Sequence, residues 1–168
     1  AISHKDKQME TLIEFLNSTA LNKYIMSEAW LWPTLEIFHF FGLCLLLGSV
    51  IIFDLRALGV AREVPLIRIE TFMVSAAVGF AINLITGIVF IIGDPDRYLP
   101  NIAFRIKMIL ILVAGLNVLY YTWRLRPQVL RGLEGKDLSG GARYVAALSL
   151  TLWTCVIVLG RIIPYVEK

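Results

Sequence analysis

Glu36 and His39 are the pair of side chains in this sequence that most clearly suggest chemistry. They lie three residues apart inside an otherwise apolar stretch from about residue 33 to residue 53. On a helix, residues three apart share a face, so a carboxylate at 36 can orient the imidazole at 39 and fix its tautomer. Ionisable groups inside a membrane are costly and usually face the protein interior. The pair therefore predicts a polar site with His39 as the candidate metal or haem ligand.

Cationic side chains at the ends of two other apolar stretches are expected to join this site. Arg105 and Lys107 begin the stretch from about 105 to 123, and Arg161 lies near the end of the stretch from about 144 to 163. Guanidinium and ammonium groups bind carboxylates, other anions and haem propionates. Asn83 and Asn117 lie deeper and extend the predicted cofactor-binding cluster.

A purely structural interpretation of the same residues remains open. Arg105 and Lys107 can extend along the helix surface and place their charges among lipid headgroups. Glu36 can pair with Arg161 to hold two helices together, with His39 as a buried hydrogen-bonding residue. The sequence does not choose between this interpretation and a binding site.

Other candidate sites have weaker support. Cys44 and Cys155 are lone thiols within apolar stretches, without metal-binding spacing, so we expect them to act as small apolar fillers. The chain has no phosphate-binding glycine loop, nucleophile elbow or zinc-protease motif. The net charge of +3 is carried by basic residues beside the apolar stretches, which argues against nucleic-acid binding.

The elements that must position these residues are predicted to be membrane-spanning helices. Hydrophobic residues make up 58% of the 168 residues, against about 45–50% in typical globular domains. Charged residues cluster between four apolar stretches, and a helix needs about 20 apolar residues to cross the hydrocarbon. We therefore predict an all-α, integral membrane four-helix bundle over residues 30–168, with spans at about 33–53, 71–92, 105–123 and 144–163.

Residues 1–29 form a second predicted unit. Apolar residues recur there at roughly helical spacing among polar ones, as in Leu12, Phe15, Leu16, Leu21, Tyr24 and Ile25. This pattern is typical of an amphipathic helix that lies on the membrane surface.

Basic residues in the loops predict the orientation. The first loop carries Arg56, Arg62 and Arg68, and the third carries Arg124, Arg126, Arg131, Lys136 and Arg143. An excess of arginine and lysine marks cytoplasmic loops, so both termini are expected in the periplasm. Three lysines near the N-terminus oppose this assignment, namely Lys5, Lys7 and Lys23.

The second apolar stretch carries a stripe of mostly small residues, four apart, at Ser75, Gly79, Asn83 and Gly87. Small residues at this spacing allow helix backbones to approach closely. The partner is either another helix of this chain or a neighbouring copy.

Several segments together resemble those of an uncharacterised family of bacterial proteins, classed as a domain of unknown function, whose members are small four-helix inner-membrane proteins. They are residues 32–39, 54–59, 104–107, 115–117 and 160–161, and the likeness extends from about Leu12 to Tyr165. The resemblance implies the four-helix fold and the bacterial inner membrane. It implies no activity, cofactor or catalytic residue, and residues 1–8 look like an extension relative to the family.

Three functions follow as expectations. The first is an accessory subunit of a membrane complex or homo-oligomer, with an outward-facing polar site made by Glu36, His39, Arg105 and Arg161. The second is a redox or cofactor-binding membrane subunit with haem b, copper or a quinone at His39, although a six-coordinate haem needs another ligand from Met, a second chain or a partner. The third is a small transporter or proton pathway, and enzymatic action on a lipid is a further alternative. In each case we expect bound lipid.

Overall fold

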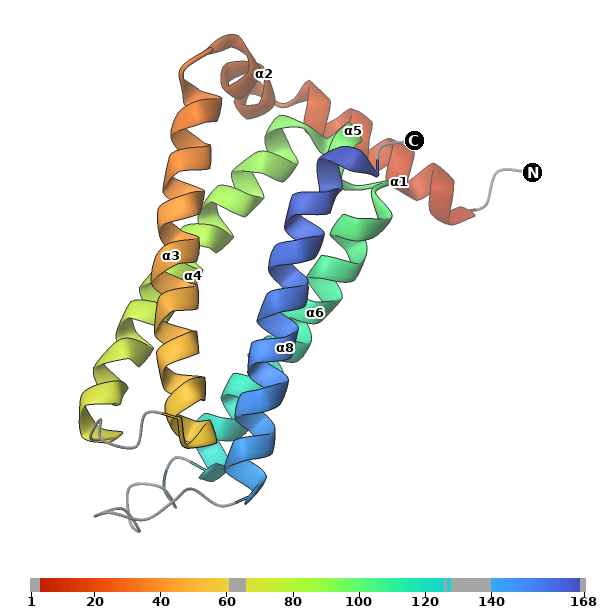
Figure 1. The fold of residues 1–168 in the computed structure, drawn as a ribbon. Helices are drawn as coiled ribbons and strands as arrows, with labels where there is room; N and C mark the ends of the chain where they lie inside the picture. The colour runs from red at the N-terminus through yellow and green to blue at the C-terminus, as the bar shows by residue number, and fades with distance from the viewer. Residues whose placement is uncertain (1–3, 61–65, 126, 128–139, 167–168) are drawn as a thin grey trace.

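A computed structural model describes residues 4–60, 66–125, 127 and 140–166, and every regular element in them is helical. Figure 1 shows two surface helices followed by a bundle of long helices. In chain order the elements are α1 (His4–Ser18), α2 (Ala20–Ser27), α3 (Leu31–Leu58), α4 (Leu66–Gly93), α5 (Pro95–Tyr98), α6 (Ile102–Tyr120), the π-helical turn η1 (Tyr121–Leu125), α8 (Gly140–Ile162) and the 3₁₀ turn η2 (Ile163–Tyr165). The all-α prediction is confirmed.

Four of these helical segments are long and apolar enough to cross a membrane. They are Leu31–Leu58, Thr71–Gly93, Ile102–Arg124 and Gly140–Tyr165. The chain is therefore a multi-pass membrane protein. Both ends of the described chain lie at the same end of the bundle, which we call the terminal end, and the opposite end is the loop end (Figure 1).

The first span is longer than the sequence predicted. Asp54 and Arg56, expected in the first loop, belong to α3, which continues to Leu58. The helix ends at Gly59, whose φ of 92° lies in the left-handed region that favours glycine. The Gly59 N–H donates to the Arg56 carbonyl, and the Val60 N–H donates to the Leu55 carbonyl, both at 3.0 Å.

The helices α3 and α4 cross in direct backbone contact, so the predicted small-residue stripe packs within this chain. A Cβ added at Gly79 would lie 2.6 Å from the carbonyl oxygen of Gly42 and from the amide nitrogen of Leu46. A Cβ added at Gly42 would lie 2.5 Å from Nδ2 of Asn83. Neither position has room for a side chain. Gly87, on the same stripe, has nothing within 4 Å of an added Cβ.

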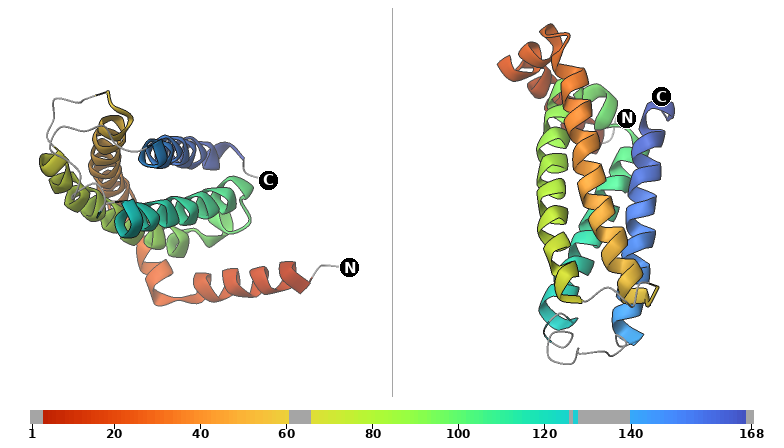
Figure 2. Two further views of the ribbon diagram at one scale, coloured as in Figure 1. Left: turned by 90° about the horizontal axis from the view of Figure 1, so that it is seen from below. Right: turned by 60° about the vertical axis from the view of Figure 1, so that its left-hand side comes forward.

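The helices α6 and α8 form the other half of the bundle, and α8 also packs against α3 (Figure 2). Nδ2 of Asn117 on α6 donates to the Val145 carbonyl of α8 at 3.1 Å. Asn101 caps the start of α6 through the amides of Ala103 and Phe104, and it also donates to the Ile163 carbonyl at 2.9 Å. These two amide side chains fix α6 against α8 near both ends. Among the described residues, α4 packs mainly on α3 and much less on α6 or α8.

The surface helices α1 and α2 lie across the terminal end, and α1 extends beyond the bundle (Figure 2). Nδ2 of Asn22 donates to the carbonyls of Ile92 and Gly93 at 2.8 and 3.1 Å, which caps the end of α4. Ile25 is buried against Gly93, whereas Phe15 and Tyr24 are exposed by 65% and 52%. The predicted surface helix is thus two helices, which are docked through one face and expose both apolar and charged side chains elsewhere.

Several of the basic loop residues that predict the orientation are not described by the structure. Arg62, Arg126, Arg131 and Lys136 lie outside the described residues, as does the side chain of Arg68. The predicted orientation of the chain in the membrane stays a prediction.

The glycine crossing gives a direct test of the fold. Gly42→Ala places a methyl group against the backbone of α4 and is expected to cost about 1–3 kcal/mol, the usual cost of overpacking. Gly48→Ala, on the same helix with nothing within 4 Å of its Cβ, is the matched control. Thermal unfolding in detergent measures the effect. Equal melting temperatures of the two variants would contradict the close crossing.

Candidate functional site

His39 lies in the bundle interior, where its partner is Thr86 on α4 rather than Glu36. The His39 Nδ1 and Thr86 Oγ1 atoms are 2.7 Å apart. The Thr86 hydroxyl donates its one hydrogen to the Ile82 carbonyl at 2.8 Å, so it accepts from Nδ1–H of His39. This arrangement leaves Nε2 of His39 with a free lone pair. The ring also packs edge-on against Phe90, with centroids 5.4 Å apart.

Glu36 does not orient His39, contrary to the prediction. Its carboxylate accepts from the indole N–H of Trp32 one turn earlier, at 3.1 Å, and the side chain is exposed. Three residues on a helix are about 60° apart around the axis. Glu36 therefore points toward the outside of the bundle, whereas His39 points inward to Thr86.

Lys107 is the cation that enters the interior. Its side chain lies over Gly160 of α8, where an added Cβ would be 3.2 Å from Nζ. The absence of a side chain at 160 therefore makes room for the ammonium group. Lys107 and His39 line the same cavity.

Arg105 and Arg161 do not join this cluster. Both side chains are exposed, and Arg161 instead contacts Tyr165, with its guanidinium 5.7 Å from the ring centroid. The predicted Glu36–Arg161 pair is also absent from the described structure, because each residue has a different partner. Of the five ionisable residues in the predicted site, His39 and Lys107 therefore point inward. The other three, Glu36, Arg105 and Arg161, are exposed.

Two adjoining cavities occupy the bundle between its four long helices. The histidine cavity has a volume of about 110 Å³ and is lined by His39, Asn83, Lys107 and Trp153 together with apolar side chains. The aspartate cavity has a volume of about 410 Å³ and extends toward the loop end, where Asp54 lines it. The two cavities share walls made by Leu46, Phe80 and Trp153.

The two asparagines that we expected to extend the site have different roles. Asn83 lines the histidine cavity and donates to the Gly79 carbonyl at 2.9 Å, whereas its Oδ1 has no hydrogen-bond partner among the described residues. Asn117 lines the aspartate cavity instead, and its amide is used to join α6 to α8. Only Asn83 therefore belongs to the histidine cavity.

Asp54 is a candidate residue that sequence reasoning missed. It is 3% exposed and hydrogen-bonds the Ser149 side chain, but its Oδ2 has no partner within the part of the chain that the structure describes. Asp54 was assigned to a loop because the apolar stretch ends just before it. Its position one residue after Phe53, in the helical register of Leu46 and Val50, was the available signal.

The described residues do not fit two of the expected cofactors. They contain no group of three His, Cys, Asp or Glu side chains that could hold a metal ion, which leaves copper at His39 without further ligands of these types. A cavity of about 110 Å³ is below the about 300–1,000 Å³ of ordinary ligand pockets, so a haem ring has no room beside His39. The headgroup of a quinone is much smaller than a haem and can leave its tail outside.

Comparisons with protein-family models, with curated proteins and with solved structures gave no match to the chain. The resemblance to an uncharacterised bacterial family stays a prediction, and the site has to be interpreted from its own geometry.

The bond between His39 and Thr86 can be tested by stability. Thr86→Val keeps the shape of a buried side chain but leaves Nδ1–H of His39 without an acceptor, which costs about 1–3 kcal/mol. Thr154→Val is the matched control, since the exposed Thr154 hydroxyl bonds only its own helix. We expect a melting temperature several degrees lower for Thr86→Val only. A loss of the same size in both variants would contradict the bond.

Proposed function

We propose that this chain is a membrane subunit that binds a quinone, with the headgroup in the histidine cavity. The main support for this proposal is that the histidine cavity contains both hydrogen-bond donors and hydrogen-bond acceptors. Lys107 offers an ammonium donor, whereas Oδ1 of Asn83 and Nε2 of His39 offer acceptors without other partners among the described residues. The indole N–H of Trp153 also has no partner in this part of the chain.

A quinone suits this set better than a simple anion does. A phosphate or carboxylate uses donors alone, and the two acceptors would then stay unpaired in an apolar surrounding at a cost of about 1–3 kcal/mol each. A quinone carbonyl accepts from Lys107, and the hydroxyl of the reduced form donates to His39 or Asn83. The oxidised form therefore uses the Lys107 donor alone, whereas the reduced form also pairs an acceptor of the cavity.

The walls of the histidine cavity also suit a molecule with a long apolar tail. Leu84 and Ile88 of α4 and Met108 of α6 line it, and they are 49%, 49% and 37% exposed on the outside of the bundle. In a membrane this surface faces lipid. A tail can therefore leave sideways between α4 and α6 into the bilayer.

Binding of decylubiquinone to the protein in lipid nanodiscs tests the proposal. Lys107→Gln removes a charge-assisted hydrogen bond of about 1.5–3 kcal/mol, which corresponds to a dissociation constant raised at least about tenfold. His39→Asn should weaken binding of the reduced form, decylubiquinol, since asparagine can replace the Nδ1 donor toward Thr86 but not the Nε2 acceptor.

The matched control is Arg105→Gln, which removes an exposed cation two residues from Lys107 on the same helix. It should leave the affinity unchanged. Decylubiquinone that binds the Lys107→Gln and wild-type proteins equally well would contradict the proposal.

We further propose that the protein lies in a bacterial inner membrane with its terminal end in the periplasm. The support is the excess of basic residues at the loop end, among them Arg56, Arg124 and Arg143, over the short connection that contains α5. Alkaline phosphatase fused after Lys168 should be active in cells, and green fluorescent protein fused there should be dark. The opposite pair of results would reverse the orientation.

A further inference from the structure

The aspartate cavity contains a second feature that the quinone proposal does not use. A carboxyl side chain, Asp54, is buried in a cavity whose other walls are nearly all apolar. One of its oxygens accepts no hydrogen bond from any described residue, and a buried unpartnered carboxylate is costly. A ligand with a positive charge beside Oδ2 of Asp54 would offset this cost.

The walls of the cavity define what kind of cation fits. Five aromatic side chains line it, namely Phe53, Phe72, Phe80, Tyr121 and Trp153. Aromatic faces attract cations, most strongly where water is excluded, and they are the usual partners of quaternary ammonium groups. A small hydrated metal ion would find one carboxylate and few other oxygens, so the walls favour an organic cation.

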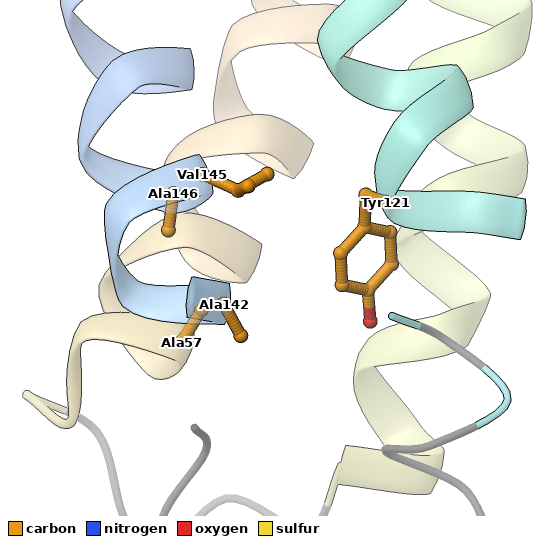
Figure 3. Packing of buried hydrophobic residues seen from close by; sticks show 5 residues of the cluster. All are labelled: Ala57, Tyr121, Ala142, Val145 and Ala146. Carbon is orange, nitrogen blue, oxygen red and sulfur yellow. The ribbon is translucent and has the colours of Figure 1, made fainter. Parts of the chain in front are cut away.

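Small side chains keep the space open near the loop end. Ala142 and Ala146 of α8 present only methyl groups there, and Val145 of the same helix points toward Tyr121 (Figure 3). The Tyr121 ring is held edge-on by Phe53, with centroids 4.8 Å apart. The volume of about 410 Å³ lies within the about 300–1,000 Å³ of ligand pockets.

We propose that the aspartate cavity is a binding site for a lipophilic organic cation, with Asp54 as its counter-ion and the surrounding aromatic rings as its walls. A monovalent ammonium group with an aromatic or short aliphatic body is the class of ligand that this geometry accommodates. The site is separate from the histidine cavity, since Lys107 and Asp54 line different spaces.

Phenyltrimethylammonium and its uncharged isostere tert-butylbenzene are suitable probes, measured by equilibrium dialysis against protein in nanodiscs, with empty nanodiscs subtracted. We expect saturable binding of the cation to the wild type. Asp54→Asn keeps the size of the side chain and should weaken cation binding at least about tenfold while leaving tert-butylbenzene binding unchanged. Asp54→Glu keeps the charge and should retain cation binding.

Asp96→Asn, which changes an exposed carboxylate at the terminal end, is the control and should bind the cation as the wild type does. Lys107→Gln should also leave cation binding unchanged, so the two proposals can fail separately. The inference is overturned if the wild type shows no saturable cation binding, or if Asp54→Asn binds the cation as tightly as the wild type. If Asp54→Asn does not fold, loss of cation binding in a folded Asp54→Glu protein would also overturn it.

Discussion

The close crossing of α3 and α4 at Gly42 and Gly79 is the constraint on which the interior of this protein depends. Backbone atoms of the two helices meet there without intervening side chains. Asn83 and Thr86 follow Gly79 on α4, and His39 precedes Gly42 by one turn on α3, so the crossing brings His39 within hydrogen-bond distance of Thr86. Because α4 is held by α3, it approaches α6 and α8 much less closely among the described residues. The two cavities occupy the space that results.

The interior polar groups are separated along the bundle. His39 and Asp54 are fifteen residues apart on α3, which corresponds to about 22 Å along a helix. The histidine cavity offers donors and acceptors together, whereas the aspartate cavity offers one carboxyl among aromatic rings. Trp153 forms part of the wall of both. Because the histidine cavity and the aspartate cavity differ in chemistry, they are suited to two different kinds of ligand.

The sequence predicted the four spans well because lipid imposes a strong constraint, and an apolar stretch of about 20 residues has few other uses. It predicted the small-residue contact, although the choice between a helix of this chain and a second copy depended on the tertiary fold. It did not predict which polar residues face inward. Arg105 and Lys107 are two residues apart and therefore point in different directions, and only the packing of α8 at Gly160 shows which one enters. Asp54 was missed because a charge at the end of an apolar stretch has the pattern of a loop residue. The expected accessory or scaffolding role stays a prediction, since no contact within one chain tests it.

The central claim is that the interior of the bundle binds a ligand through Lys107 and His39. A cryo-electron microscopy map of the protein extracted together with its surrounding lipid, without added detergent, tests this claim most directly. We predict density for a headgroup within hydrogen-bond distance of Nζ of Lys107, with its tail leaving between α4 and α6. A map in which Lys107 points out to a lipid phosphate and side chains fill the histidine cavity would contradict it.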